Sequence, residues 1–506
     1  MKKILSLVLL ICMVSVLFVA CKQNGGTIET TPSDTSPNTP TETTGSAATK
    51  PVYKDNTTAN LGGDTFRILA WEDAYYLEFE YDINDTSMKS VNDSIRDRNR
   101  TVNTNHNCNF EFVYVLGNYE NREIYLNKAL SLDAGTPSDY IDIYAGYSQV
   151  TGLLSTKGLC ANLLKYTGED SLDFSYPWWP QSLIEDASFD GRLYFCTGDI
   201  ATSVLWWMST IYFNKKMMET LGNDPLEPYK LVDNKQWTID KLIEYCTDVG
   251  VNNDGVKDFD EDIFGFYSDF DVYFDALQVG CGFTMLEPDA KNMLKLSSTY
   301  ASQAEGQLHN KLREFIHGPD SFHKVGGGLI NDKLKDSFMK GNSLFTIRNA
   351  AYAHDLRMSD LANFNYGILP VPMLNTAQGQ YYTQITPEHT VYAIGFSSTK
   401  KEGAAVVLQS MAAESYIQVT PVIFDEAMKL RYSHEIDDAR MFDTIKNSIR
   451  FEAGRYYNLV LNDYCWKTWR LNLKDDTAYL GSAQGAIRAI NMLIINLNKT
   501  LAGADK

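Results

Sequence analysis

The sequence of 506 residues contains only one long apolar run, and that run lies at its N-terminus. A channel or transporter with several membrane spans is therefore excluded, because each span needs about 20 apolar residues. Runs of basic residues are also missing: 45 Lys and Arg face 64 Asp and Glu, which gives a net charge of −19. A negative field of this size repels nucleic acids and anionic lipids, so we expect no nucleic-acid partner.

Common catalytic and metal-binding signatures are absent as well. The sequence has no GxSxG and no glycine-rich phosphate loop, and His434-Glu435 lacks the second histidine of HExxH. Its cysteines show no CxxC spacing, which argues against a zinc site. We expect the cysteines of the folded body to be mostly buried as small apolar residues, although an extracytoplasmic setting leaves a disulfide open. They are Cys108, Cys160, Cys196, Cys246, Cys281 and Cys465.

The N-terminus has the features of an export signal. Two lysines precede an apolar stretch over residues 4–20, and Cys21 follows. This pattern is typical of a secretory signal peptide, which we expect over residues 1–20. Phe18-Val19-Ala20-Cys21 resembles the bacterial lipoprotein box, although leucine, which is commoner at its first position, lies one place earlier here. The resemblance implies a lipid on Cys21 and a place on the extracellular face of the cell membrane. A secreted protein with a cleaved leader is the alternative.

Residues 21–61 are expected to form a flexible linker. The segment is rich in Thr, Ser, Pro, Gly and Asn and has few large apolar side chains. Such a composition buries too little surface to offset the entropy of the chain. The linker would hold the folded body, which begins near residue 62, away from the lipid anchor.

From residue 62 onward, short apolar runs alternate with amphipathic stretches, which predicts an α/β fold. The overall composition, 44% hydrophobic and 22% charged, is that of a globular protein. Strands and helices in alternation favour parallel β-α-β units, in which ligands bind at the carboxyl ends of the strands. We expect strands near 66–71, 107–115, 140–145, 191–196, 204–213, 343–347, 366–372 and 390–396, and helices near 91–105, 123–132, 152–158, 238–249 and 400–413, with a mostly helical C-terminal part from about 414.

Five short segments carry a family resemblance in their order along the chain. They are Pro137-Ser138-Asp139-Tyr140-Ile141-Asp142-Ile143, Gly191-Arg192-Leu193-Tyr194-Phe195, Ile211-Tyr212-Phe213-Asn214-Lys215-Lys216, Phe338-Met339-Lys340-Gly341-Asn342-Ser343-Leu344-Phe345 and Asn365-Tyr366-Gly367-Ile368-Leu369-Pro370-Val371-Pro372. The ordered series resembles the family 1 extracellular solute-binding proteins of ABC importers, which are sugar-binding lipoproteins with a fold like that of maltose-binding protein. It covers about residues 62–413, and the chain is longer than typical members.

The resemblance implies a periplasmic-binding-protein-like type II fold, with two α/β lobes joined by hinge crossings. By position, lobe one comprises residues 62–198 and 374–412, and lobe two comprises residues 204–368 and 414–506. The lobes would close round a small molecule and dock on a membrane permease. We expect a monomer without a cofactor.

Aromatic and polar residues near strand ends and hinge crossings are candidates for ligand contacts. Sugars stack their C–H faces on aromatic rings, and polar side chains fix their hydroxyls. For any one aromatic residue, packing in the core is the commoner role. Because successive strand residues point to opposite faces, at most one of Trp206 and Trp207 is expected to face a ligand. The candidate contacts are Trp71, Glu72, Tyr147, Asp199, Trp207, Arg348, Tyr352, Glu388 and Trp466.

One acidic loop resembles a calcium-binding loop. Residues 252–262 read NNDGVKDFDED, in which Asn252, Asp254 and Asp258 are the candidate ligands. Gly250 stands where the first acidic ligand belongs. An acidic, solvated turn is the alternative reading.

The sequence thus favours a binding protein rather than an enzyme: a lipid-anchored subunit that captures a carbohydrate and delivers it to an ABC permease. An anchored glycoside hydrolase or lyase is the alternative, because it would also be acidic and rich in aromatic residues. Such an enzyme needs two paired carboxylates, and the sequence gives no way to pair its 64 acidic residues.

Overall fold

A computed structural model describes residues 53–74, 78–80, 89–252, 254–257, 261–268, 272–323 and 338–504. All of them belong to one compact unit, Tyr53–Lys506. The predicted signal peptide and Cys21 lie outside the described residues. Within the described ranges, no helix has the length and the apolar character that crossing a membrane requires.

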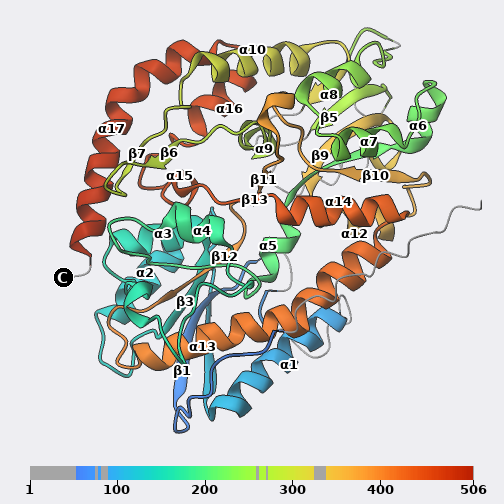
Figure 1. Cartoon of the computed structure of the whole chain (residues 1–506). Coiled ribbons are helices and arrows are strands. Elements are labelled where there is room, and N and C mark those ends of the chain that lie inside the picture. Colours follow the sequence, from blue (N-terminus) through green and yellow to red (C-terminus); the bar gives the residue numbers. More distant parts are fainter. Residues whose placement is uncertain are drawn as a thin grey trace, which may run out of the picture. The chain divides into compact units, whose positions relative to one another are not determined.

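The first lobe is built on a four-stranded sheet (Figure 1). Its strands are β1 (Thr65–Trp71), β2 (Asn109–Val115), β3 (Ile143–Tyr147) and β12 (Thr390–Ile394), in the order β12-β3-β1-β2. β1 is parallel to β2 and β3, whereas β12 runs antiparallel to β3 and pairs Thr390 with Tyr147. The carboxyl ends of β1, β2 and β3 therefore meet the start of β12 at one edge of the sheet.

Helices cover both faces of this sheet. Successive residues of a strand point to opposite sides, so apolar strands present side chains on both faces that helices must cover. The helices are α1 (Lys89–His106), α2 (Arg122–Asp133), α3 (Ser148–Thr156) and α13 (Lys401–Glu414). Phe66 of β1 packs against Gly403 of α13, whereas Trp71 lies with Tyr125 of α2 round Gly117. The short elements η1 (Leu163–Tyr166) and α4 (Gln181–Ala187) follow along the chain.

The second lobe is built on a five-stranded sheet of mixed direction. Its strands are β4 (Ser209–Asn214), β5 (Phe264–Ser268), β8 (Ser321–His323), β9 (Ser343–Asn349) and β10 (Tyr366–Leu369), in the order β10-β4-β9-β5-β8. β4 is antiparallel to β9 and β10, and β5 is parallel to β8 and β9. The helices in this part of the chain are α5 (Thr202–Trp206), α6 (Lys215–Thr220), α7 (Glu227–Asp233), α8 (Ile239–Cys246), α9 (Val272–Gly280), α10 (Gln303–His317) and α12 (Tyr352–Met358).

The remaining elements lie between and around the two sheets. Two small pairs are antiparallel β6 (Leu286–Pro288) with β7 (Leu294–Leu296) and parallel β11 (Thr383–Gln384) with β13 (Ile449–Arg450). The 3-10 turn η2 (Thr376–Gln378) precedes β11, and α13 continues into the π-helical segments η3 (Ser415–Val419) and η4 (Pro421–Arg431). The C-terminal helices are α14 (Ile436–Asn447), α15 (Ala453–Tyr456), α16 (Lys467–Lys474) and α17 (Tyr479–Gly503).

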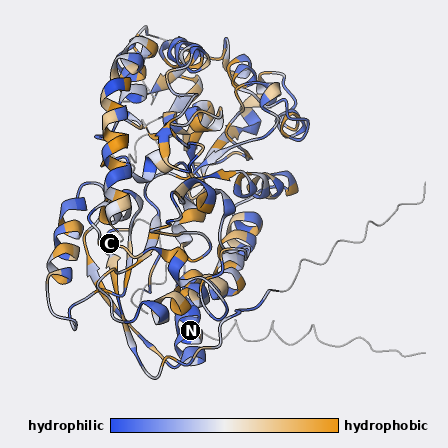
Figure 2. Ribbon diagram, turned by 60° about the vertical axis from the view of Figure 1, so that its left-hand side comes forward, coloured by the Kyte–Doolittle hydropathy of each residue, from blue (hydrophilic) through white to orange (hydrophobic). Residues whose placement is uncertain are grey.

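The long helix α17 contacts both lobes (Figures 1 and 2). The Tyr194 hydroxyl donates to the carbonyl of Leu501 at 2.7 Å in the first lobe. In the second lobe, the Tyr479 hydroxyl donates to Oε2 of Glu305 in α10 at 2.9 Å. Between these ends, the Asn498 amide donates to the carbonyl of Leu294 in β7 at 2.7 Å and accepts from its N–H at 3.2 Å. One face of α17 is buried, through Ile490, Ile494, Leu497 and Leu501.

The expected α/β fold class is confirmed, with corrections to single elements. The sheets are mixed rather than wholly parallel. Residues 191–196, all of them described, form no regular strand; they contain two isolated bridges, from Arg192 to Phe189 and from Cys196 to Tyr392. Residues 204–206 end helix α5, and β4 begins at Ser209, so the alternation argument for Trp206 and Trp207 does not apply. The six cysteines in the described part of the chain are free and buried.

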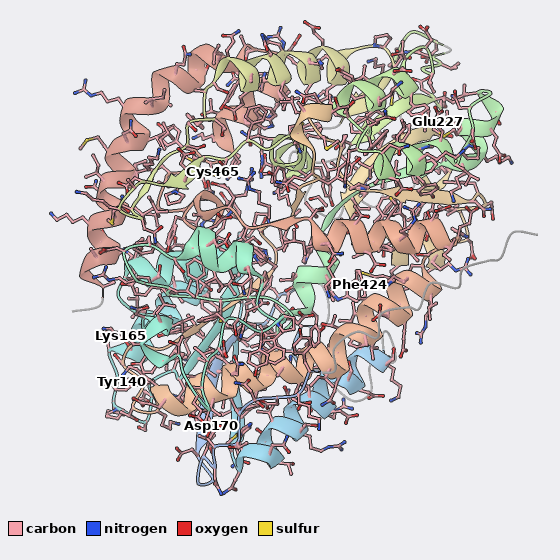
Figure 3. The ribbon with its side chains drawn as sticks, in the orientation of Figure 1. Tyr140, Lys165, Asp170, Glu227, Phe424 and Cys465 are labelled. Carbon is pink, nitrogen blue, oxygen red and sulfur yellow. The ribbon has the colours of Figure 1, made fainter. Side chains whose placement is uncertain are left out.

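The end of the expected linker packs against the first lobe. Thr57 is buried, and the backbone N–H groups of Thr58 and Ala59 donate to the carboxylate of Asp170 (Figure 3). The carbonyl of Ala59 lies 2.9 Å from Nδ1 of His106 at the end of α1. Residues 53–61 therefore form part of the folded body, because these hydrogen bonds fix their backbone.

Candidate functional site

Three predicted site residues meet at the edge of the first sheet. Trp71 ends β1, Tyr147 ends β3, and Glu388 lies two residues before β12. The Trp71 indole N–H donates to Thr390 Oγ1 at 2.8 Å, and the Trp71 and Tyr147 rings are 5.8 Å apart. Both aromatic residues are buried. The hydrogen bond and the ring contact tie β1, β3 and β12 together at this edge.

Glu388 is a buried carboxyl group beside these rings. Its side chain is 8% exposed, and among the described residues its Oε2 atom has no hydrogen-bond partner. Burial raises the pKa of Glu388 to about 7, while nearby Arg470 acts in the opposite direction. Burial, together with the charge of Glu388, also raises the pKa of Tyr147 well above its ordinary value. A buried carboxyl group with a free oxygen is costly unless a ligand or a proton satisfies it.

The C-terminal part of the chain brings a cation near this cluster, because the charge of Arg470 acts on both Glu388 and Tyr147. Arg470 of α16 lies over the ring of Trp466, with its Cζ atom 4.3 Å from the ring centre. Asp275 of α9 is fully buried and accepts from Nε of Arg470 at 2.8 Å and from Nη1 of Arg455 at 2.6 Å. We call Trp71, Tyr147, Glu388, Trp466 and Arg470 the inter-lobe cluster.

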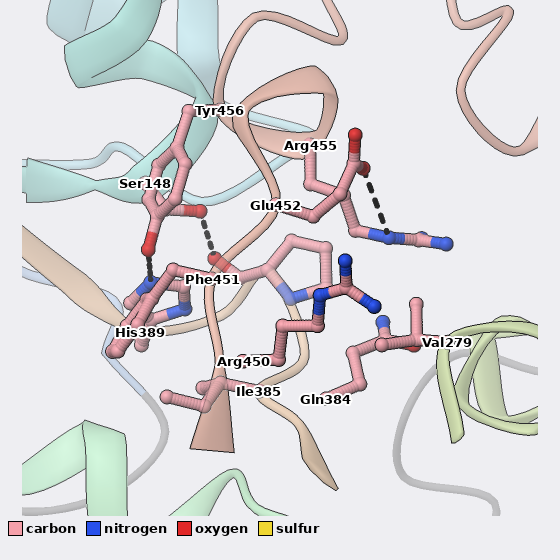
Figure 4. Close-up of a pocket in the computed structure, with 11 residues that line it drawn as sticks. Ser148, Val279, Gln384, Ile385, His389, Arg450, Phe451, Glu452, Arg455 and Tyr456 are labelled. Carbon is pink, nitrogen blue, oxygen red and sulfur yellow. Dashed lines mark hydrogen bonds and ion pairs between the residues drawn. The ribbon is translucent and has the colours of Figure 1, made fainter. Parts of the chain in front are cut away.

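A second group of residues joins the lobes next to this cluster (Figure 4). The segment 384–389, which crosses back to the first lobe, lies against residues 450–456 round a cavity of about 20 Å³, enough for one water molecule. His389 donates from Nδ1 to the carbonyl of Thr386 at 2.8 Å, so its Nε2 atom accepts from the Tyr456 hydroxyl at 3.2 Å. Burial lowers the pKa of His389 to about 4, which keeps the ring neutral.

The fit between the lobes is tight here. A side chain on Gly152 of α3 would lie 2.1 Å from the carbonyl oxygen of Tyr456 in α15, so glycine is required at this close approach. Gln384 is 2% exposed, and among the described residues neither polar atom of its amide has a hydrogen-bond partner. Oε1 of Gln149 on α3 is unpartnered in the same sense. Buried polar atoms without partners therefore gather where the two lobes meet.

The other predicted site residues lie elsewhere. Glu72 follows Trp71 and is exposed. Asp199 accepts from the Thr420 hydroxyl at 2.6 Å and lies 3.6 Å from Nζ of Lys446, beside a separate cavity of about 260 Å³ between α4, α5 and α14. Trp207 is buried, and its carbonyl accepts from the N–H of Thr386 at 3.1 Å.

Arg348 and Tyr352 pack together within the second lobe. Arg348 ends β9 with Asn349, and its Cζ atom lies 5.2 Å from the ring centre of Tyr352 and 5.9 Å from that of Tyr273. Burial lowers the pKa of the Arg348 guanidinium.

The predicted calcium loop remains a prediction. Asn252 Oδ1 accepts from the backbone N–H of Gly255 at 2.7 Å, and Asp254 Oδ1 accepts from that of Val256 at 2.8 Å. Both side chains thus stabilise the turn itself. Asp258 lies outside the described residues. Among the residues that are described, no group of three or more His, Cys, Asp or Glu side chains is placed to hold a metal ion.

Sequence reasoning missed Arg470 and Asp275. Arg470 follows Trp466 by four residues, a spacing that brings side chains together on a helix, so this signal was present in the sequence. Nothing in the sequence links Asp275 to Arg470, because 195 residues separate them.

The pH dependence of stability tests the environment of Glu388. The folded state retains a proton between pH 4.5 and 7 that the unfolded state gives up, so this group lowers stability as pH rises through that window. We expect Glu388→Gln to match the wild type near pH 4 and to be more stable by about 3 kcal/mol at pH 8. Denaturant titrations at both pH values measure this. A difference that is the same at both pH values would contradict the assigned environment.

The comparisons with known proteins concern the fold. A scan against protein-family models finds no match, and a search of curated proteins finds none. Solved structures do match. M. tuberculosis UspC is 13% identical, with a TM-score of 0.55 over 85% of this chain and 100% of that one. A cyclo/maltodextrin-binding protein complexed with maltotetraose is 14% identical, with a TM-score of 0.52 over 87% of this chain and 97% of the other.

A third match is described by its family. A family 1 extracellular solute-binding protein from Bifidobacterium longum subsp. infantis is 15% identical, with a TM-score of 0.51 over 87% of this chain and 100% of that one. The chain has the fold of the family 1 solute-binding proteins. In this solute-binding fold, the inter-lobe cluster occupies the carboxyl edge of the first sheet, where the sequence predicts ligand contacts.

Proposed function

We propose that this protein is an extracytoplasmic binding protein that captures a sugar or oligosaccharide between its two lobes and delivers it to an ABC permease. The observation that carries the proposal is the inter-lobe cluster itself. It combines the buried rings of Trp71 and Tyr147, and the partly buried ring of Trp466 beneath Arg470, with a buried carboxyl group that has an unpartnered oxygen. Rings of this kind stack on the apolar faces of sugars, and a few polar atoms fix the hydroxyl groups.

The fold supports this proposal by analogy. Two of the matching structures hold saccharides by their titles, maltotetraose in one and α-D-tagatose in the other. A two-lobe protein of this kind closes round its ligand by a hinge motion, and the closed form would be the one that docks on the permease. We extend the proposal to an N-terminal signal peptide and a lipid on Cys21, which would place the protein on the extracellular face of the membrane.

A melting-temperature screen with saccharides tests the proposal. A ligand at one hundred times its Kd raises the free energy of unfolding by about 2.7 kcal/mol, which is easily seen as a rise in Tm. We expect at least one neutral mono- or oligosaccharide to produce such a rise. Mass spectrometry of the recovered sugar distinguishes the alternative: an anchored glycoside hydrolase or lyase would cleave it, whereas a binding protein returns it intact. A failure of every saccharide to bind would refute the proposal.

Trp466 is the best residue for a test of the site itself, since it is only partly buried. We expect Trp466→Ala to weaken saccharide binding about tenfold, which equals about 1.4 kcal/mol, with little loss of stability. Phe396→Ala is the matched control, because Lys401 lies over that ring much as Arg470 lies over Trp466, but away from the cluster. Calorimetric titration measures both; equal affinities in the two variants would remove Trp466 from the site.

A further inference from the structure

Glu388 and the charged groups that act on it carry, taken together, an excess of negative charge. Besides burial, the groups that act on it are its own backbone, the Thr386 side chain, Arg470 from α16 and Glu120 after β2. Glu388 acts in turn on Tyr147 from β3, and neutral His389 is its neighbour in sequence. Glu120 raises the pKa of Glu388, and Arg470 lowers it. The only opposing charge among these groups is therefore that of Arg470.

Arg470 is already engaged by another carboxylate. It donates twice to Asp275, from Nε at 2.8 Å and from Nη2. Arg455 shares Asp275 and lies 3.8 Å from Oε2 of Glu452. Two guanidinium groups are thus balanced by two carboxylates, Asp275 and Glu452, and little positive charge remains for Glu388 or for a ligand beside it.

The neighbourhood of Tyr119 continues the same pattern. Burial raises the pKa of Tyr119, as do Asp463 and Glu120, while Arg122 and Arg470 lower it. Arg122 lies over the Tyr119 ring, with its Cζ atom 4.5 Å from the ring centre, and donates to the Tyr119 carbonyl. Of the charged groups that act on Tyr119, two are carboxylates (Glu120 and Asp463) and two are cations, of which Arg470 is already paired with Asp275. An anionic group in this place would meet repulsion that the buried surroundings of Glu388 strengthen.

The unpartnered oxygen of Glu388 requires a hydrogen-bond donor from the ligand. Oε2 is an acceptor, in a side chain 8% exposed, beside two aromatic rings. A hydroxyl or ammonium group of a ligand would satisfy it by donating a hydrogen bond, and such a bond to a carboxylate is stronger than one between neutral groups.

We propose that Glu388 sets the charge class of the ligand: its Oε2 atom accepts a hydrogen bond from a neutral or positively charged saccharide, and the site rejects saccharides that carry a carboxylate or a phosphate. This inference rests on the proposed function of the same site. It makes Glu388 a residue that determines specificity. It also predicts that acidification, which adds a proton to Glu388, relaxes the rejection of anions.

The experiment compares matched saccharides at two pH values. Cellobiose, maltose and galactobiose are titrated calorimetrically against counterparts in which one sugar is a uronic acid, which stays ionised at both pH 5.5 and pH 8. We expect each uronic acid to bind at least tenfold more weakly than its neutral counterpart at pH 8, and the gap to narrow severalfold at pH 5.5. Glu388→Gln, which keeps the shape and an acceptor oxygen, is expected to narrow the gap at pH 8 and to abolish its pH dependence.

Glu123→Gln is the matched control, because Glu123 is an exposed carboxylate of the first turn of α2 in the same lobe. It should leave the gap between neutral and acidic saccharides unchanged. A uronic acid that binds as tightly as its neutral counterpart at pH 8 would overturn the inference and leave the proposed function intact, as would a gap that Glu388→Gln does not change. If no saccharide binds, the proposed function and this inference both fail.

Discussion

Asp275→Asn is expected to lower the free energy of unfolding by about 3–5 kcal/mol, as the removal of one partner from a buried ion pair does. The Asp275 side chain is fully buried and accepts from Arg455 and Arg470. The asparagine keeps the size but loses the charge, so Arg470 loses this counter-ion and Arg455 retains only Glu452, 3.8 Å away. Both guanidinium groups are only about one-tenth exposed. Urea denaturation at pH 7 measures the change.

Asp97→Asn is the control for this prediction. Asp97 forms an ion pair at 2.8 Å with Arg100 on the exposed face of α1, where both side chains are at least half exposed. An exposed pair of this spacing contributes only about 0.3–0.5 kcal/mol. A loss for Asp275→Asn no larger than that of Asp97→Asn would show that the two arginines find other partners, and that Asp275 does not hold α9 and α16 together.

Trp71→Ala is expected to destabilise the protein by about 3–5 kcal/mol and to abolish saccharide binding. Trp71 is wholly buried, packs on Tyr147 and donates to Thr390 Oγ1. Its removal leaves a cavity at the point where three strands of the first sheet meet, and it deprives the hydroxyl of Thr390 of a donor. Thermal and denaturant unfolding give the stability, and calorimetric titration gives the affinity.

Trp71→Phe separates the two contributions of this side chain. Phenylalanine keeps most of the ring contact with Tyr147 but has no N–H for Thr390, so we expect a loss of about 1–2 kcal/mol. Trp466→Ala, at the partly exposed side of the cluster, should weaken binding without a comparable loss of stability. If Trp71→Ala and Trp466→Ala lowered the free energy of unfolding equally, Trp71 would not be the packing centre that its burial indicates.

Elements with a clear local pattern were predictable from the sequence. The helices over 89–106 and 401–414 and the strands over 109–115 and 343–349 follow from the spacing of their apolar residues. The structure of segments 191–196 and 204–206 was not predictable in this way, although these segments are equally apolar. They lie at the crossing between the lobes, where nearly every residue is buried, so burial no longer alternates and the pattern does not distinguish a strand from a helix or an extended connection.

The site was predictable on one side only. Trp71, Tyr147 and Glu388 could be predicted because the ends of neighbouring strands meet at one edge of a sheet. Their charge environment could not, since it depends on α9 and α16, which are far apart in sequence and meet through packing alone. The balance of the two arginines follows from that contact.

The helix α17 has a mechanical consequence for any movement of the two lobes. The Tyr479 hydroxyl at its N-terminal end donates to Glu305 of α10 in the second lobe, and the carbonyl of Leu501 near its C-terminal end accepts from Tyr194 of the first lobe. The helix therefore connects the two lobes along its length. An opening of the lobes must either pivot about this helix or break one of these two hydrogen bonds. We therefore expect this helix, which lies outside the segments that cross between the lobes, to limit how far the lobes open.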